Sequence, residues 1–515
     1  MLFKEKSSVL AWLVLLLIFL MYLPALRMYM FGDGYVLLDY CYSGWRHPAL
    51  FFDLINNYFF RPLVNISHLL NYTLFGEQTA FYILITLGIH LLNVFLLYRL
   101  MLKVTGKAHM AILTMLLYGT SPLYSGATLE SGFAASPDIT LLCFFLGILL
   151  CFARTQRVFG FVNRVFIFLC LLGAIGSKEA WVIIPLSVLS FLLLVMNYPL
   201  RKAILAVFPM SLLVIIYAIP LFLMPWLSSK SSAFAYSGFD LENLTAMLAK
   251  ACFLLCRYIG LGDYFYGDAW QYLVILLVVA GFLLALILLN NKLALWGFCV
   301  MVLAHIPTLP IPYAPSRFNY IPLVGFWIMI VAFADQIIRK LKPTAAYLQQ
   351  LVIGLFIGSV IVYNIIMLQW EIKDYSRLGE ACQTIVSMYK PIKDQVRLNQ
   401  PVLFINQGTR RPIQEVEQSL QGNLKLLFAR PEALWQLVQF APLANFAGTP
   451  FKQRMFPVQA EDFEKILHTP FQLLIFTDQG FFWGTPEMRQ ALQQFYRTHR
   501  QLPAQAGMYR LIPVE

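Results

Sequence analysis

The stretch VLAWLVLLLIFLMYLPALRMY, residues 9–29, decides the class of fold. It carries no charge before Arg27 and is as long as the roughly 20 residues that a helix needs to cross the hydrocarbon of a bilayer. It lacks a small-residue cleavage site and is longer than the apolar core of a signal peptide. We therefore interpret it as a membrane span that stays in the protein.

Ten further apolar runs follow, at 80–102, 109–121, 139–153, 164–176, 180–198, 203–226, 271–290, 293–308, 318–338 and 345–369. Charged residues make up only 12 % of the 515 residues and the mean hydropathy is +0.68, whereas soluble domains carry about 25 % charged residues. The runs show no strand-like alternation, and only helices or closed barrels satisfy the backbone in lipid. The sequence predicts an all-α polytopic membrane bundle of about 11 transmembrane helices.

The charges predict an orientation for this bundle. With Lys4 and Lys6 in the cytoplasm, 14 basic residues before residue 370 fall inside and eight fall outside, as the positive-inside rule expects. Among the acids in the same stretch, only Glu5 and Asp335 fall inside. The net charge of +12 therefore has a topological cause and predicts no nucleic-acid binding. Chemistry that needs carboxylates is expected at the outer face.

The composition changes after about residue 370, where the tail holds 13 of the 26 acids and 16 of the 38 basic residues. Apolar runs at 401–406, 424–429, 471–477 and 508–514 predict strands, and segments near 411–421, 431–440, 459–467 and 485–500 predict helices. We expect a membrane domain, 1–369, followed by a small soluble α/β domain, 370–515, which an odd number of spans places outside the cytoplasm.

The first outer loop, about 30–79, holds two candidate site residues. Asp33 lies between two glycines, where it is either a general base or a turn residue. Arg61 lies in Phe60-Arg61-Pro62-Leu63 and is either a phosphate contact or an interfacial anchor for lipid headgroups. The planar fork of arginine suits phosphate oxygens. Spacing alone leaves both alternatives open at both positions.

Five segments in order carry a resemblance to a known superfamily. They are FRPLVNISHLLNYTLFG (60–76), IHLLNVFLLYRL (89–100), SPLYSGATLESGFAASPD (121–138), SKE (177–179) and SRFNYIPLVGF (316–326). Over residues 25–335 they resemble the motifs of GT-C membrane glycosyltransferases. The resemblance is to the branch of the protein O-mannosyltransferases and the transmembrane-and-tetratricopeptide-repeat mannosyltransferases, with their bacterial relatives.

The resemblance implies a role for several residues. Asp33 is implied as the catalytic acid of the first loop, and Asp138 matches the aspartate of a G-R-x-D motif. Donor or phosphate contacts are implied for three cations: Arg61, Lys178 and Arg317. Glu179 is implied to pair with Lys178 or an arginine. His90 is implied to line the groove, although interhelical hydrogen bonding by His90 and Asn93 is an equally open alternative.

The chain also departs from the motifs. Where the family has a doubled aspartate, only Asp33 is present, and Asp39 is a candidate substitute. Ser121, Tyr124 and Gly126 replace two histidines and a glutamate, and Glu130 is a candidate to compensate for the lost acid. The arginine before Asp138 is absent as well, and the tail domain replaces the repeat array.

The implied activity is transfer of a hexose from a polyprenyl-phosphate sugar donor to a protein, lipid or glycan acceptor at the outer membrane face. Two alternatives from other classes are a transporter or flippase of lipid-linked sugars and a non-catalytic envelope assembly protein. No internal repeat of the kind found in transporters is visible, and the acids gather at one face.

The sequence assigns no residues as metal ligands and leaves the cofactor open. The eight cysteines show no metal-ligand spacing. A divalent ion bridging Asp33 and the phosphate is left open, but no full ligand set is visible, so the cofactor is unknown. Two of three glycosylation sequons, at Asn65, Asn71 and Asn243, lie in the first loop, where a glycan would obstruct the site. This favours a bacterial plasma membrane.

Overall fold

The computed structural model of the chain describes residues 2–30, 61–76, 78–129, 136–154, 160–227, 241–258, 269–309, 316–340, 343–389, 402–406, 438–440, 472–477, 480–487, 489–490 and 493–494. The chain divides into two compact units. The first comprises Met1–Leu26, Pro48–Ser67 and Ile83–Lys373, and the second comprises Arg27–His47, His68–Tyr82 and Asp374–Glu515. Candidate Asp33, Asp39 and Glu130 lie outside the described residues.

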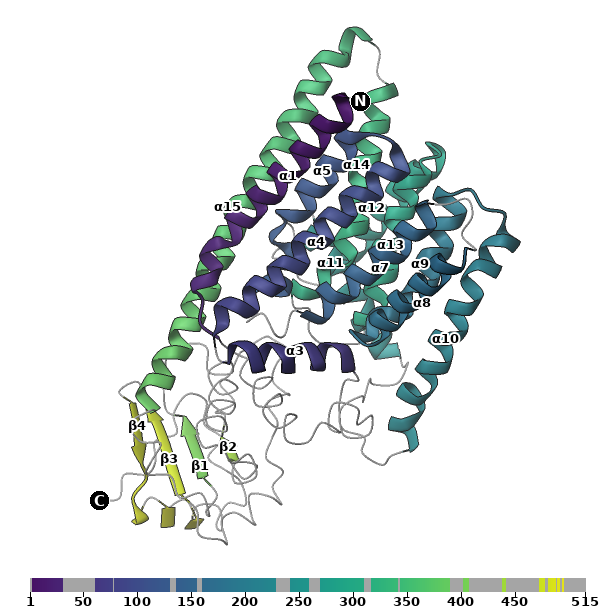
Figure 1. Ribbon diagram of the computed structural model, residues 1–515. Helices are drawn as coiled ribbons and strands as arrows, with labels where there is room; N and C mark the ends of the chain where they lie inside the picture. The colour runs from purple at the N-terminus through teal and green to yellow at the C-terminus, as the bar shows by residue number, and fades with distance from the viewer. Residues whose placement is uncertain are drawn as a thin grey trace. The chain divides into compact units, whose positions relative to one another are not determined.

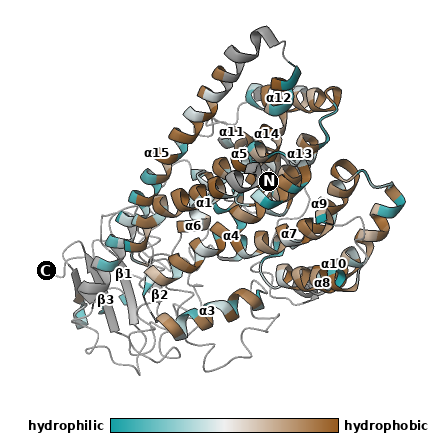
Figure 2. Cartoon of the chain, turned by 45° about the horizontal axis from the view of Figure 1, so that its top comes forward, coloured by the Kyte–Doolittle hydropathy of each residue, from teal (hydrophilic) through white to brown (hydrophobic). Residues whose placement is uncertain are grey.

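The first unit is a bundle of apolar helices (Figure 1). Seven of the helices that the structure describes are long and apolar enough to cross a membrane. They are α1 (Leu2–Tyr22), α4 (Thr79–Thr105), α7 (Ser136–Arg154), α10 (Leu200–Leu227), α12 (Ala269–Leu288), α14 (Pro322–Lys340) and α15 (Pro343–Tyr389). In Figure 2, which colours each residue by its hydropathy, these helices are mostly hydrophobic.

Four further predicted spans are shorter apolar helices or helical runs. These are α5 (Ala108–Gly119), α8 (Phe161–Ile175), the run η4 (Glu179–Ile183), α9 (Ile184–Ser190) and η5 (Phe191–Val195), and α13 (Lys292–His305) with η7 (Ile306–Thr308). Helical structure thus lies in each of the eleven predicted apolar ranges, so the helical membrane class is confirmed. The number of helices that cross the bilayer stays a prediction.

Further elements lie between these helices along the chain. They are η1 (Leu23–Arg27), α3 (Pro62–Phe75), η3 (Pro122–Tyr124), α6 (Ser125–Leu129), α11 (Leu241–Tyr258) and η8 (Ser316–Asn319). The predicted span 180–198 is not one regular helix but three pieces, 3₁₀, α and π. Pro185 lies in the first turn of α9, where its missing N–H is tolerated, and Lys178 before η4 is fully extended.

Two glycines let α13 and α14 touch through their backbones. A Cβ atom at Gly297 would lie 2.6 Å from the carbonyl oxygen of Gly325, and one at Gly325 would lie 2.5 Å from the amide nitrogen of Met301. Such approaches exclude any side chain. Gly325 belongs to the last sequence motif, so packing alone explains that motif position. The contact also fixes the start of α14, which directly follows η8.

The second unit contains a sheet of four short strands, β1 (Val402–Asn406), β2 (Val438–Phe440), β3 (Gln472–Thr477) and β4 (Gly480–Trp483), in the order β2-β1-β3-β4. β1 runs parallel to β2 and β3, and β4 is antiparallel to β3. The strands predicted at 401–406 and 471–477 are confirmed. The predicted helix 431–440 is wrong at residues 438–440, because Val438 and Phe440 pair with β1. The predictions for 411–421, 424–429, 459–467 and 508–514 fall outside the described residues.

Candidate functional site

A buried ion pair joins α7 to the connection after α8. The Lys178 ammonium donates to Asp138 Oδ1 at 2.5 Å, and the two side chains are 10 % and 5 % exposed. Asp138 lies in the first turn of α7, where the helix dipole favours a carboxylate. Burial disfavours the charged lysine and lowers the pKa of Lys178 below its ordinary value, although Asp138 opposes this shift. The pair therefore holds a cation away from water.

A second ion pair lies next to the first along the chain. Arg61 donates to both oxygens of Glu179, from Nε at 2.9 Å and from a terminal nitrogen at 2.7 Å. The start of α3 is held there because the Leu63 amide donates to the Gly176 carbonyl at 3.0 Å. A side chain at Gly176 would meet Leu63, with Cβ atoms 3.1 Å apart. This backbone contact places Arg61 beside Lys178 and Glu179.

The aromatic ring of Phe318 lies close to two lysines. The ammonium nitrogens of Lys178 and Lys250 lie 5.0 Å and 5.4 Å from the centroid of its ring, within cation–π range. Lys250 comes from α11 and also donates to the carbonyl of Thr308. The positive charges of Arg61 and Arg317 lower the pKa of Lys178 further. Arg61 pairs with Glu179, the residue after Lys178, and Arg317 is the residue before Phe318. We call Arg61, Lys178, Lys250 and Arg317 the cation cluster.

The residues of the cation cluster come from four parts of the chain that are distant in sequence: the start of α3, the turn after α8, helix α11, and η8 before α14. Three of its members, Arg61, Lys178 and Arg317, are the three cations that sequence motifs singled out. Lys250 was missed as a site residue, although its charge in an otherwise apolar stretch is a signal. Such a cluster can bind phosphate oxygens by charge and by multiple N–H donors.

His90 and Asn93 lie deep in the bundle, and neither has exposed surface. His90 Nδ1 is 2.8 Å from the Tyr320 hydroxyl. The Asn93 amide donates to that hydroxyl at 3.1 Å and to the Ile139 carbonyl at 2.8 Å. Of the two interpretations of these residues, interhelical hydrogen bonding agrees with this geometry, whereas a groove-lining His90 would need exposed surface. They connect α4, α7 and the residue after η8.

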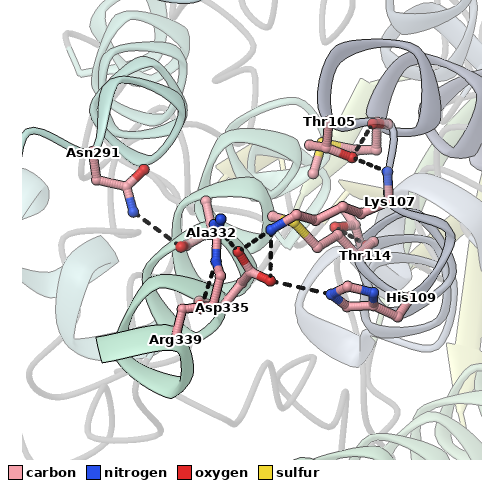
Figure 3. Close-up of polar contacts among 10 residues, drawn as sticks. Thr105, Lys107, His109, Thr114, Asn291, Ala332, Asp335 and Arg339 are labelled. Atoms are coloured by element: carbon pink, nitrogen blue, oxygen red, sulfur yellow. Dashed lines mark hydrogen bonds and ion pairs between the residues drawn. The ribbon is translucent and has the colours of Figure 1, made fainter. Parts of the chain in front are cut away.

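A separate polar cluster surrounds Asp335 at the far end of α14 (Figure 3). Its carboxylate accepts from Lys107 Nζ at 2.8 Å, lies 3.1 Å from His109 Nε2, and pairs with Arg339. Helix α14 rises about 28 Å over its 19 residues. The Asp335 cluster and Arg317 therefore mark opposite ends of the bundle. Within the described ranges, no three His, Cys, Asp or Glu residues are placed to hold a metal ion.

No family model matches the chain, and no curated protein matches it. Among solved structures, it is similar to ArnT from Cupriavidus metallidurans bound to undecaprenyl phosphate, with a TM-score of 0.46 and 11 % identity over 95 % of this chain and 94 % of that one. It is also similar to ArnT from the same organism in the apo state, with a TM-score of 0.39 and 14 % identity over 95 % of each chain. At this level of likeness, the chemistry has to be read from the chain's own side chains.

Proposed function

We propose that the protein is a membrane glycosyltransferase that takes a sugar from a polyprenyl-phosphate-linked donor and transfers it to an acceptor at the outer face. The observation that carries this proposal is the cation cluster at one end of a bundle of apolar helices. A lipid phosphate presents an anion at the end of an apolar chain. It therefore needs a cationic site at the end of apolar helices.

Burial argues against the alternative in which these cations only anchor the protein to lipid headgroups. The Lys178 side chain is only 10 % exposed and pairs with Asp138. A buried ion pair costs several kcal/mol of desolvation per ion, about as much as its attraction returns. A snorkelling anchor keeps its charge in water and avoids that cost. A lysine held in this way is better explained by an anion that binds inside the site.

In the proposed reaction, the acceptor hydroxyl oxygen attacks the anomeric carbon of the donor. The new carbon–oxygen bond forms as the bond to the phosphate oxygen breaks, and the phosphate leaves with the electron pair. Asp33 is the candidate base that takes the hydroxyl proton. The cation cluster stabilises the negative charge that develops on the leaving phosphate. Asp138 and Glu179 orient Lys178 and Arg61 for this task.

Protein, lipid and glycan hydroxyls are all suitable acceptors. A bacterial plasma membrane, a cytoplasmic N-terminus and an extracytoplasmic tail domain belong to the same proposal, because they follow from the charge pattern and the sequons.

The test is transfer of labelled sugar from polyprenyl-phosphate sugars in membranes that contain equal amounts of each variant. We expect Asp33→Asn to lose transfer while it still binds undecaprenyl phosphate, and Arg317→Ala to weaken both binding and transfer. Arg339→Ala is the matched control, because it removes an arginine at the far end of α14, the helix that follows η8. Transfer at the wild-type level in Arg317→Ala would overturn the role of the cluster. Lipid-phosphate binding without transfer by the wild type, across a broad donor panel, would favour a transporter.

A further inference from the structure

Glu371 is an acid at the end of the last apolar span, and no sequence motif marked it. It lies on α15 just beyond the predicted run 345–369, within the range Gly354–Arg377 that also holds Lys373, Asp374 and Arg377. Its Oε2 accepts a hydrogen bond from the Ser125 hydroxyl at 3.1 Å, across 246 positions of the chain. The carboxylate of α15 therefore reaches the start of α6.

Ser125 connects Glu371 to the turn that carries Arg317. The Gly126 amide donates to the Ser316 hydroxyl oxygen at 2.8 Å, and the Ser125 hydroxyl lies 3.5 Å from the same oxygen. Ser316 is the residue directly before Arg317. The carboxylate thus orders the Ser125–Gly126 segment, and that segment holds the start of η8.

The other end of the same turn is held by separate hydrogen bonds. The Asn319 amide donates to the Leu123 carbonyl at 2.9 Å, and the Tyr320 hydroxyl lies 2.8 Å from His90. Arg317 and Phe318, between these anchors, are the two residues of the turn that belong to or contact the cation cluster. The anchor at Ser316 is linked through Ser125 to Glu371 of α15, on the side of the turn next to Arg317.

We propose that Glu371 is a positioning residue, which holds Arg317 in the cation cluster through Ser125, Gly126 and Ser316. This inference rests on the proposed function, since it assigns Glu371 to the phosphate site. It also accounts for a departure in the sequence. Gly126 stands where the related motif has a glutamate, and Glu371 brings a carboxylate to the neighbouring residue from another helix.

The experiment measures binding of undecaprenyl phosphate to the full chain in detergent for Glu371→Ala, Arg317→Ala and the double variant. We expect Glu371→Ala to weaken binding about tenfold, as for the loss of one charge-assisted hydrogen bond. On the Arg317→Ala background the same change should have no effect, because a residue that acts through Arg317 cannot act without it. Asp374→Ala, one turn further along α15 and exposed, is the matched control.

A conservative variant separates positioning from a fold defect. In Glu371→Gln the amide oxygen still accepts from Ser125, so binding should stay within about threefold of the wild type. A tenfold loss that is equal on both backgrounds would show that Glu371 acts independently of Arg317 and would overturn the proposal. So would unchanged binding in Glu371→Ala while Arg317→Ala is impaired. A wild type that binds no undecaprenyl phosphate would instead remove the proposed function and this role together.

Discussion

In the proposed function, Lys250 makes the binding of a lipid phosphate depend on pH. Burial disfavours its charged form and lowers the pKa of Lys250 to about 8. The ammonium is charged below this pKa and neutral above it. An anion that contacts Lys250 should therefore bind more weakly as the pH rises through about 8. The second ionisation of a phosphate monoester, with a pKa near 6, is complete before that range begins.

The size of the effect follows from the pKa and from the strength of one contact. With a pKa of about 8, roughly nine-tenths of Lys250 is charged at pH 7 and only about 3 % at pH 9.5. A hydrogen bond to a charged group contributes about 1.5–3 kcal/mol, which is roughly a 10- to 100-fold change in affinity. Lys250 is only partly buried, so solvent screens its charge and the lower end applies. We expect affinity to fall about tenfold between pH 7 and 9.5.

The assay is a titration of the purified protein with undecaprenyl phosphate at several pH values. Lys250→Arg keeps its charge throughout and should show a flat profile at high affinity, whereas Lys250→Met should be flat at low affinity. Lys202→Met, an exposed lysine of α10, controls for net charge. A wild type and a Lys250→Arg variant that weaken in parallel would refute the reasoning, because another group would then be titrating. A flat wild-type profile would also refute it.

Three further predictions test the pairing and the packing. Lys178→Met should lower stability by about 3–5 kcal/mol, because it leaves the buried Asp138 carboxylate without its partner, and adding Asp138→Asn should recover most of the loss in thermal unfolding. Equal instability of the single and double variants would contradict the pairing. Arg61→Lys should weaken lipid-phosphate binding at least about tenfold although the charge is kept, because the bidentate hydrogen bond to Glu179 is lost. Unchanged affinity would contradict this role of Arg61. Gly325→Ala should destabilise the protein by about 1–3 kcal/mol, while Gly281→Ala, with open space around it, should be neutral or stabilising in the same measurement.

The sequence motifs were sufficient to predict part of the candidate site. Arg61, Lys178 and Arg317 stand in short segments whose order resembles a known superfamily, and the structure brings them together. Lys250 and Glu371 were beyond that reasoning. Neither residue lies in a motif. Only the packing of α11 and α15 shows that one reaches Phe318 and the other Ser125.

The sheet of the second unit shows the same limit. The five- and six-residue strands β1 and β3 are apolar enough to be predicted alone, but the three residues of β2 were placed in a helix. A strand of three residues forms only because it pairs with the neighbouring strand β1.

The sequence by itself determined that the chain folds as apolar helices and where they lie, because in lipid each helix must satisfy its backbone within its own segment. It also separated the two ends of the bundle, since charges stay at the ends of spans. Tertiary structure alone decided which side chains meet. The interhelical contacts of His90, the crossing at Gly297 and Gly325, and the Glu371–Ser125 hydrogen bond join residues far apart along the chain. A contact of that kind depends on how helices pack, and no local pattern of residues encodes it.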